Sequence, residues 1–133
     1  MSVERVEREI ARLQEGGQDA DLVFADRWYV IYRRVPTAGA RLSLPVEADV
    51  IVPVPEGYPA AVIDLAGLPT NSPLLPRLKG GQNSQGQVSV SGVKWQLASY
   101  HPHNGGGGPP WDSAKHGFDT YLDHIIAWLG QLT

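Results

Sequence analysis

The stretch that most limits the fold of this chain runs from Val93 to Trp111, because its two halves cannot share one structure. The first half has the mixed aromatic and aliphatic composition of a β-strand. Asn104 to Pro110 contains four consecutive glycines and two prolines. These residues cost backbone entropy or lack an amide donor, so they cannot hold a helix or a strand ladder. A strand that ends at Pro102 is therefore followed by an irregular loop.

Side-chain parity within this strand brings a hydroxyl and an imidazole to the same side. Alternate residues of a strand face the same way, and here these are Trp95, Leu97, Ser99 and His101. Ser99 and His101 are therefore the predicted nucleophile and base of any catalytic site. A less specific interpretation stays open, since serine two residues from histidine is common, tryptophans often anchor a core, and a glycine run often serves as a connector.

Length and composition restrict the class of protein. A chain of 133 residues with 42% hydrophobic residues is expected to fold as a single domain, 1–133, around its own core. Its net charge of −3 argues against nucleic-acid binding, and no apolar run reaches membrane-spanning length. The charged N-terminus lacks the apolar segment of a signal peptide, so we expect a cytoplasmic protein with neither nucleic acid nor membrane as a partner.

The chain contains no cysteine. This excludes a disulfide framework, a thiolate metal site and a cysteine nucleophile. No cofactor is expected, and proteins or small molecules are the expected partners.

Hydrophobic periodicity predicts the order of the secondary structure. Residues 2–15 read as an amphipathic helix that Ser2 caps and Gly16-Gly17 ends. From Phe118 onward, apolar residues at helical spacing mark a C-terminal helix. Strands are predicted at 22–35 (one long strand or a bent pair), 48–54, 61–65, 88–90 and 95–100, with local pairing near 42–44.

This order predicts an α+β fold: an N-terminal helix, an antiparallel β-meander, a long irregular crossing rich in proline, and a C-terminal helix. Both helices are expected to pack against one face of the sheet. A parallel α/β architecture would need strands that alternate with helices, and that alternation is missing. The side chains expected to be buried where the last strand meets the final helix are Trp95, Leu122, Ile125 and Leu129.

Two segments together resemble the bacterial branch of the ubiquitin-conjugating enzyme (UBC) superfamily. In the first, Asp49-Val-Ile-Val-Pro-Val-Pro-Glu-Gly-Tyr-Pro59, a strand leads into a Pro-x-Gly-Tyr-Pro turn. The second, Trp95-Gln-Leu-Ala-Ser-Tyr-His101, has a Trp-x-x-x-Ser-x-His pattern before Trp111 and the last helix. The match covers about 80 residues, and the combination is more specific than either segment alone. It is similar to the prokaryotic family E branch, which resembles the ubiquitin-fold-modifier conjugating enzyme, and it implies a UBC-like fold.

The resemblance implies a role in a bacterial ubiquitin-like modification pathway. Proteins of this superfamily take the C-terminal glycine of a ubiquitin-like protein from an activating enzyme and pass it to an acceptor protein, normally through a cysteine thioester. This chain departs from that pattern, because Gln96 stands where the cysteine would be and an amide is not a nucleophile. Three explanations stay open: another residue carries the acyl group, the domain binds without chemistry, or a cysteine has been replaced in this sequence.

A second motif gives a lower-ranked set of site residues. His101-Pro-His-Asn104 is similar to the His-Pro-Asn tripeptide of conjugating enzymes, whose asparagine steadies the oxyanion. It has one inserted residue and follows the proposed active strand instead of preceding the nucleophile. If it is the true equivalent, His103 and Asn104 belong to the site and Ser113 becomes the nucleophile. Ser113 ranks below Ser99, because Asp112 or Ser113 is more simply the cap of the last helix.

Two functions from different classes follow. The first is acyl transfer through an oxyester on Ser99, with His101 as the base and amides of Gly105–Gly108 stabilising the oxyanion. Residues i and i+2 of a strand lie too far apart for a direct hydrogen bond, so this requires a bend before Pro102 or a bridging water. The second is a non-catalytic module or adaptor that binds the ubiquitin-like protein or its activating enzyme.

A metal site is the third and weakest alternative. Imidazoles two residues apart on a strand can share a cation. The histidines that would form it are His101, His103, and His116 or His124. Neither a cysteine nor a His-Glu-x-x-His helix accompanies them, so no metal is expected.

Overall fold

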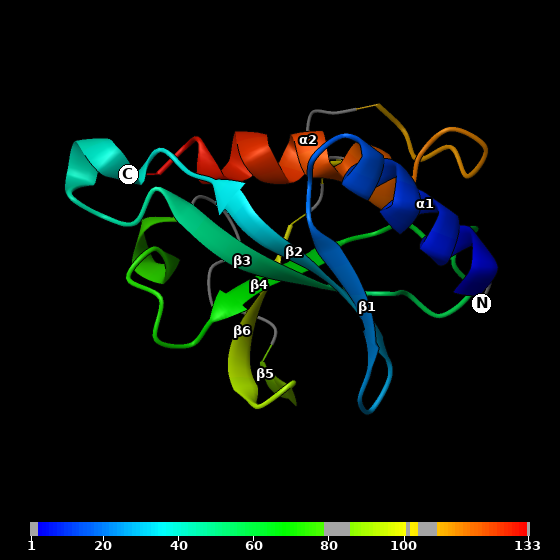
Figure 1. Ribbon diagram of the computed structural model, residues 1–133, viewed down its shortest axis with the longest axis horizontal. Coiled ribbons are helices and arrows are strands. Elements are labelled where there is room, and N and C mark those ends of the chain that lie inside the picture. The colour runs from blue at the N-terminus through cyan, green and yellow to red at the C-terminus, as the bar shows by residue number, and fades with distance from the viewer. Residues whose placement is uncertain (1–2, 79–85, 101, 104–108, 133) are drawn as a thin grey trace.

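The computed structural model describes residues 3–78, 86–100, 102–103 and 109–132. Its α-helices lie near the two ends of the chain, and its strands lie between them (Figure 1). The elements are α1 (Val3–Glu15), β1 (Ala20–Phe24), β2 (Trp28–Pro36), a 3₁₀-helix (Gly39–Leu42), β3 (Glu47–Pro53), β4 (Leu65–Pro69), a 3₁₀-helix (Leu75–Arg77), β5 (Gln87–Val90), β6 (Val93–Ser99) and α2 (Phe118–Leu129).

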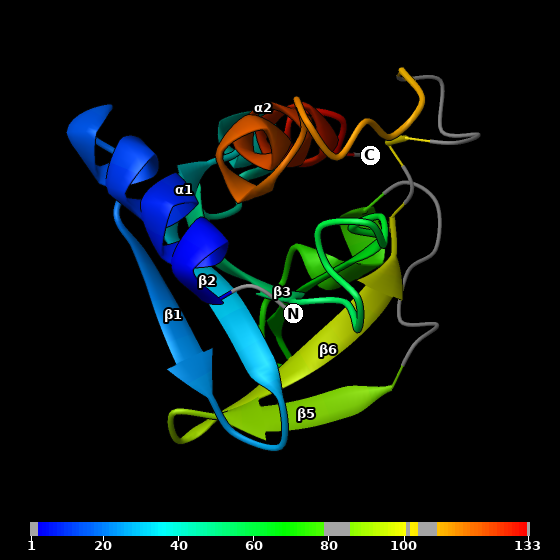
Figure 2. The same ribbon diagram turned by 90° about the vertical axis from the view of Figure 1, so that its right-hand side faces the viewer.

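The strands of the described residues form one six-stranded antiparallel sheet in the order β1-β2-β3-β4-β6-β5. Consecutive strands are neighbours as far as β4, after which the chain crosses to the edge, forms β5 and returns as β6. The sheet is curled, and α1 and α2 lie over the same face of it (Figure 2). The predicted α+β fold is confirmed, and its topology is consistent with a UBC-like arrangement.

Helix α1 forms where the sequence predicts it, because its apolar residues repeat at helical spacing and point toward the sheet. Val6, Ile10 and Leu13 are buried. The helix ends at a glycine pair, of which Gly17 has φ +89°, a left-handed conformation that glycine adopts without strain. The predicted cap, Ser2, lies outside the described residues.

Residues 22–35 form the hairpin of β1 and β2, which corresponds to the bent pair, one of the two forms predicted for this segment. Two other predictions differ in detail from the structure. The segment predicted to begin a strand at Ala61 joins the ladder only at Leu65, because its neighbour β6 ends opposite that residue. Residues 42–44 do not pair. The chain forms a 3₁₀-helix there, and a Cβ at Gly39 would overlap the carbonyl oxygen of Pro45.

Apolar side chains pack on both faces of the sheet. The larger cluster lies between the sheet and the helices and includes Ile125 and Leu129 of α2, both fully buried as predicted. Leu122 is only partly buried at its margin. The smaller cluster lies on the opposite face. It contains Tyr29, Ile31, Ile51, Val90, Trp95 and Leu97.

The position of Trp95 corrects one prediction. Trp95 is buried, but it packs away from α2, because in β6 it is Ala98 that faces the helix side. The β5–β6 hairpin covers the indole, whose Nε1 donates to the Val90 carbonyl oxygen at 3.2 Å. None of the helices among the described residues is long and apolar enough to cross a membrane.

Candidate functional site

Ser99 is the last residue of β6, where its backbone pairs with Leu65 of β4. It is partly exposed, and strand parity places it on the side of Trp95 and Leu97, away from the helices. The next residue is held from two directions, because the Tyr100 amide donates to the Asp64 carbonyl oxygen at 3.1 Å and its hydroxyl donates to the His124 carbonyl oxygen at 2.6 Å. Ser99 therefore sits at a fixed strand end.

The other predicted members of this site are not placed. His101, Asn104 and Gly105–Gly108 lie outside the described residues. The pairing of Ser99 with His101, and the oxyanion role of the glycine amides, therefore stay predictions.

Gln96, at the position that the resemblance gives to a cysteine, is a buried and fully engaged side chain. Its Nε2 donates to the carbonyl oxygens of Gly86 at 3.0 Å and Leu97 at 3.1 Å. Its Oε1 accepts a hydrogen bond from Gln87 Nε2 at 3.2 Å. A side chain used in this way links β6 to β5. Because the position is buried, a thiol placed there would not be open to a protein partner.

Three histidines from separate segments meet beside α2, and with Trp111 they form what we call the histidine cluster: His103, His116, His124 and Trp111. The ring of His103 lies 4.5 Å from that of His116, 4.9 Å from that of His124 and 5.1 Å from that of Trp111, measured between centroids. His103 is almost completely buried at the centre. The cluster thus brings His103, which follows β6, against His124 of α2.

Hydrogen bonds fix the protonation of two of these rings. His103 Nδ1 lies 2.9 Å from the Pro109 carbonyl oxygen, which can only accept, so the proton is on Nδ1. Its Nε2 is buried and has no hydrogen-bond partner among the residues that the structure describes. His116 Nδ1 accepts from the Asp112 amide at 2.9 Å, so in the neutral ring the proton is on Nε2. Burial, and then the nearby His103, lowers the pKa of His124. Contacts with the backbone therefore set the ring orientations of His103 and His116.

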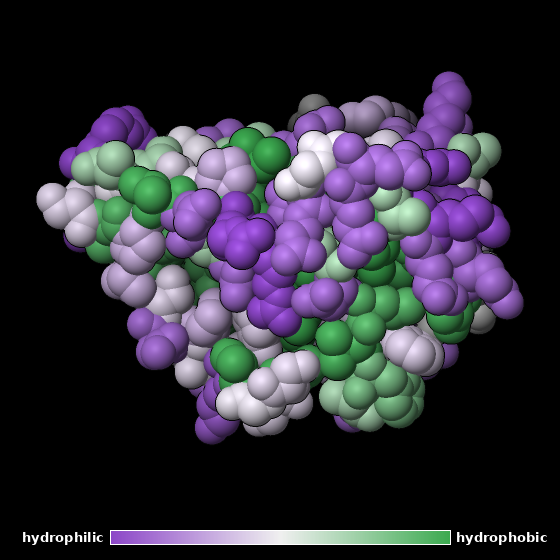
Figure 3. Space-filling model, in the orientation of Figure 1, coloured by the Kyte–Doolittle hydropathy of each residue, from purple (hydrophilic) through white to green (hydrophobic). Residues whose placement is uncertain are grey.

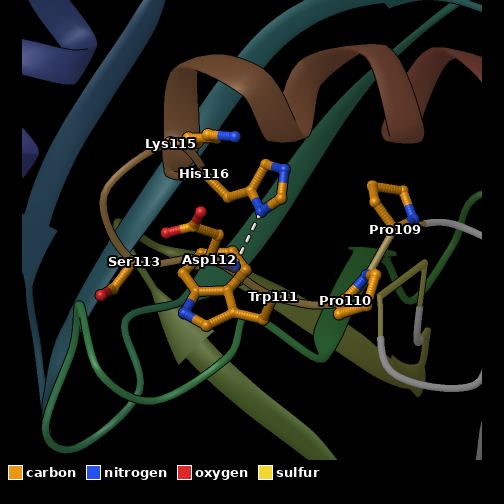
Figure 4. A pocket seen from close by; sticks show the side chains of 7 residues that line it. All are labelled: Pro109, Pro110, Trp111, Asp112, Ser113, Lys115 and His116. Carbon is orange, nitrogen blue, oxygen red and sulfur yellow. Dashed lines mark hydrogen bonds between the residues drawn. The ribbon is translucent and has the colours of Figure 1, made fainter.

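Ser113, the lower-ranked nucleophile, lies in a surface turn on the rim of an open pocket of about 630 Å³. Figure 4 shows its hydroxyl pointing away from the ring of His116. That ring could not serve it as a base in this arrangement, because its Nδ1 lone pair is used by Asp112 and its Nε2 carries the proton. The described geometry therefore gives Ser113 no base from His116.

The predicted helix cap is also corrected. Helix α2 begins at Phe118, and Gly117 is its N-cap, with the Thr120 hydroxyl accepting from the Gly117 amide at 3.0 Å. Asp112 instead closes the preceding turn, where its carboxylate accepts from the Ala114 amide at 2.9 Å. Residues 114–116 separate Ser113 from the N-cap Gly117, so neither Asp112 nor Ser113 reaches the first turn of α2.

The buried carboxylate of Glu9 links α1 to Tyr58 and to the start of α2. Glu9 Oε1 accepts from the Tyr58 hydroxyl at 2.5 Å and from the Phe118 amide at 3.1 Å, and its Oε2 pairs with Arg5 Nε at 2.8 Å. Burial, and then this carboxylate, raises the pKa of Tyr58 well above its ordinary value, so the phenol stays a donor. We call these four residues the Glu9 junction.

The Glu9 junction ties the predicted Pro55–Pro59 turn to the candidate site. Tyr58 belongs to that turn, and Trp111 Nε1 donates to the Pro59 carbonyl oxygen at 2.9 Å. The turn therefore contacts α1, the start of α2 and the histidine cluster. Sequence reasoning missed Glu9, although an acidic residue inside the apolar stripe of a helix, between Val6 and Ile10, was a visible signal.

The metal alternative gains no support from the described residues, among which no group of three or more histidine or acidic side chains is arranged to hold an ion. The geometry gives a reason, since His103 and His116 each direct one ring nitrogen to the backbone and the rings meet by packing.

Comparison with known proteins found no match for this chain, whether to a protein-family model, to a curated protein or to a solved structure.

Proposed function

We propose that this chain is a ubiquitin-conjugating-enzyme-like protein that accepts the C-terminus of a ubiquitin-like protein from an activating enzyme and carries it as an oxyester on Ser99. The observation that supports it best is the position of Ser99. It lies partly exposed at the end of β6, and the ladder to Leu65 and both bonds of Tyr100 fix its backbone. A backbone held in this way keeps the Ser99 Cα in one place, which lowers the entropic cost of presenting its hydroxyl to a reactant.

The chemistry needs a base, because a serine hydroxyl is a weak nucleophile. In the proposed step Ser99 Oγ attacks the carbonyl carbon of the thioester on the activating enzyme, His101 takes the hydroxyl proton, and the activating enzyme's thiolate leaves. Amides of Gly105–Gly108 would stabilise the oxyanion. An amine or hydroxyl of the acceptor protein then attacks the oxyester carbonyl and releases Ser99.

A non-catalytic binding module is the second candidate, and one observation favours it. The chain has no cysteine, and Gln96, at the position that the resemblance gives to that cysteine, is buried and serves as a structural link between β5 and β6. In this reading the domain binds the ubiquitin-like protein or the activating enzyme without accepting the acyl group.

Ser99→Ala separates the two functions. The protein is incubated with an activating enzyme, its ubiquitin-like protein and ATP, and covalent adducts are measured by intact mass. We expect an adduct that resists thiol reductants but yields to hydroxylamine, because an oxyester does not exchange with thiols as a thioester does. Ser99→Ala should abolish it, and Ser89→Ala, an exposed serine of β5, should not.

Two further results decide the details. His101→Ala should slow adduct formation about 100-fold if the imidazole is the base. An unchanged adduct in Ser99→Ala would refute the assignment and direct attention to Ser113. If the unaltered protein binds its partner but forms no adduct, while the activating enzyme forms its own thioester in the same tube, the binding module is the correct function.

A further inference from the structure

A polar pocket of about 180 Å³ lies between α1 and the segment that leads into α2. Four basic side chains line it: Arg5, Arg8, Arg12 and Lys115. The three arginines follow one another at helical spacing, so they share one face of α1. Hydrophilic side chains gather over α1 on the molecular surface (Figure 3). This concentration of positive charge contrasts with the net charge of −3 for the whole chain.

The acidic residues of the pocket neutralise only half of these cations. Glu9 pairs with Arg5 at 2.8 Å, and Asp119 pairs with Arg12 at 3.2 Å. None of the ion pairs found among the described residues involves Arg8 or Lys115. The pocket therefore keeps a surplus of two positive charges.

The wall of the pocket is held in place before any ligand arrives. Arg5 Nη2 donates to the His116 carbonyl oxygen at 2.7 Å, and the guanidinium of Arg5 lies 5.5 Å from the centre of the Tyr58 ring. Glu9 itself accepts from the Phe118 amide, so a residue of the protein already fills the anion position at the start of α2. An external anion would thus meet the exposed side chains of Arg8 and Lys115 beside a wall that Arg5 already holds, so the wall itself adds no ordering cost to binding.

We propose that this pocket binds a phosphate group in its dianionic form, as inorganic phosphate or a phosphate monoester. A dianion matches the surplus of two charges carried by Arg8 and Lys115, whereas a carboxylate or a phosphodiester carries one. The planar donor fork of arginine and the point charge of lysine are the two groups that proteins use for phosphate oxygens. The site is distinct from Ser99 and does not depend on acyl transfer.

Inorganic phosphate is the first probe, titrated into the ¹⁵N-labelled protein at constant ionic strength and pH 7.5 while amide shifts are recorded. We expect saturable shifts around Arg8 and Lys115 with a Kd of about 1 mM. Arg8→Gln and Lys115→Gln should each weaken binding about fivefold or more. The matched control is Arg41→Gln, an exposed residue in the 3₁₀-helix at the opposite end of the molecule (Figure 1), which should bind normally.

Three other probes identify the source of the phosphate group and test the charge argument. Phosphoserine, a monoester, should bind as well as inorganic phosphate, whereas dimethyl phosphate and acetate should bind at least about fivefold more weakly. If phosphoserine binds more weakly than inorganic phosphate, the site is assigned to the free phosphate ion. Equal binding of acetate would overturn the proposal, and so would unchanged affinity in both variants or no saturation up to about 50 mM phosphate.

Discussion

Replacement of Glu9 tests the claim that one buried carboxylate holds the Glu9 junction together. Its side chain is 96% buried in relative accessible surface, since 4% is exposed. In Glu9→Ala three donors lose their acceptor: the Tyr58 hydroxyl, the Phe118 amide and Arg5 Nε. The Tyr58 and Phe118 donors lie in the interior, whereas the Arg5 side chain is 22% exposed and can turn to water.

The magnitude follows from those three contacts. A buried donor left without a partner costs about 1 to 3 kcal/mol, so the Tyr58 hydroxyl and the Phe118 amide together cost about 2 to 6 kcal/mol. Arg5 adds little, because water replaces its lost partner. We therefore expect Glu9→Ala to lower the free energy of unfolding by about 4 kcal/mol. Glu9→Gln keeps one oxygen as an acceptor and should cost only about 1 to 2 kcal/mol.

Urea unfolding followed by tryptophan fluorescence measures this difference. With a slope of about 2 kcal/mol/M, a loss of about 4 kcal/mol moves the midpoint down by about 2 M. The control is Glu7→Ala, which removes an exposed carboxylate from the same helix and should change stability by less than about 0.5 kcal/mol. A cost below about 1 kcal/mol in Glu9→Ala would refute the reasoning, because the desolvation of the carboxylate would then offset its contacts.

Two further predictions concern the core and the histidine cluster. Ile125→Ala should lower the free energy of unfolding by about 2 to 5 kcal/mol, because this side chain of α2 is fully buried against the sheet. An unchanged denaturation midpoint would mean that α2 packs through another face. Stability should also fall as the pH drops below 6.5, because burial lowers the pKa of His124 and the unfolded chain binds its proton first. His124→Gln should flatten this pH dependence, and an equally steep profile in that variant would contradict it.

Local patterns were enough to predict most of the fold. The stripe of α1, the glycine pair after it and the apolar repeat of α2 are signals within a few residues, and each element appeared where its pattern lay. The sheet face on which Trp95 packs was not predictable in this way. Parity groups Trp95 with Leu97, but which face of the sheet the helices cover depends on contacts between distant segments.

The candidate site shows the same division. The position of Ser99 at a strand end followed from the composition of β6 and from Pro102. The histidine cluster did not, because His103, His116 and His124 come from separate segments whose meeting depends on the placement of α2. The prediction for α2 placed its cap at Asp112 or Ser113, since both are good capping residues. The hydroxyl of Thr120 and the approach of Glu9 instead fix the start at Gly117.

The distance along the chain between the partners of the Glu9 junction bears on the order in which the protein folds. Glu9 and Phe118 are 109 residues apart in the sequence. Closing so long a loop costs chain entropy that local contacts do not repay, so such contacts are expected to form after the strands have paired. A contact made after the transition state slows unfolding and leaves the folding rate almost unchanged. The Glu9 junction would then form late in folding and mainly slow unfolding, which lengthens the lifetime of the native state.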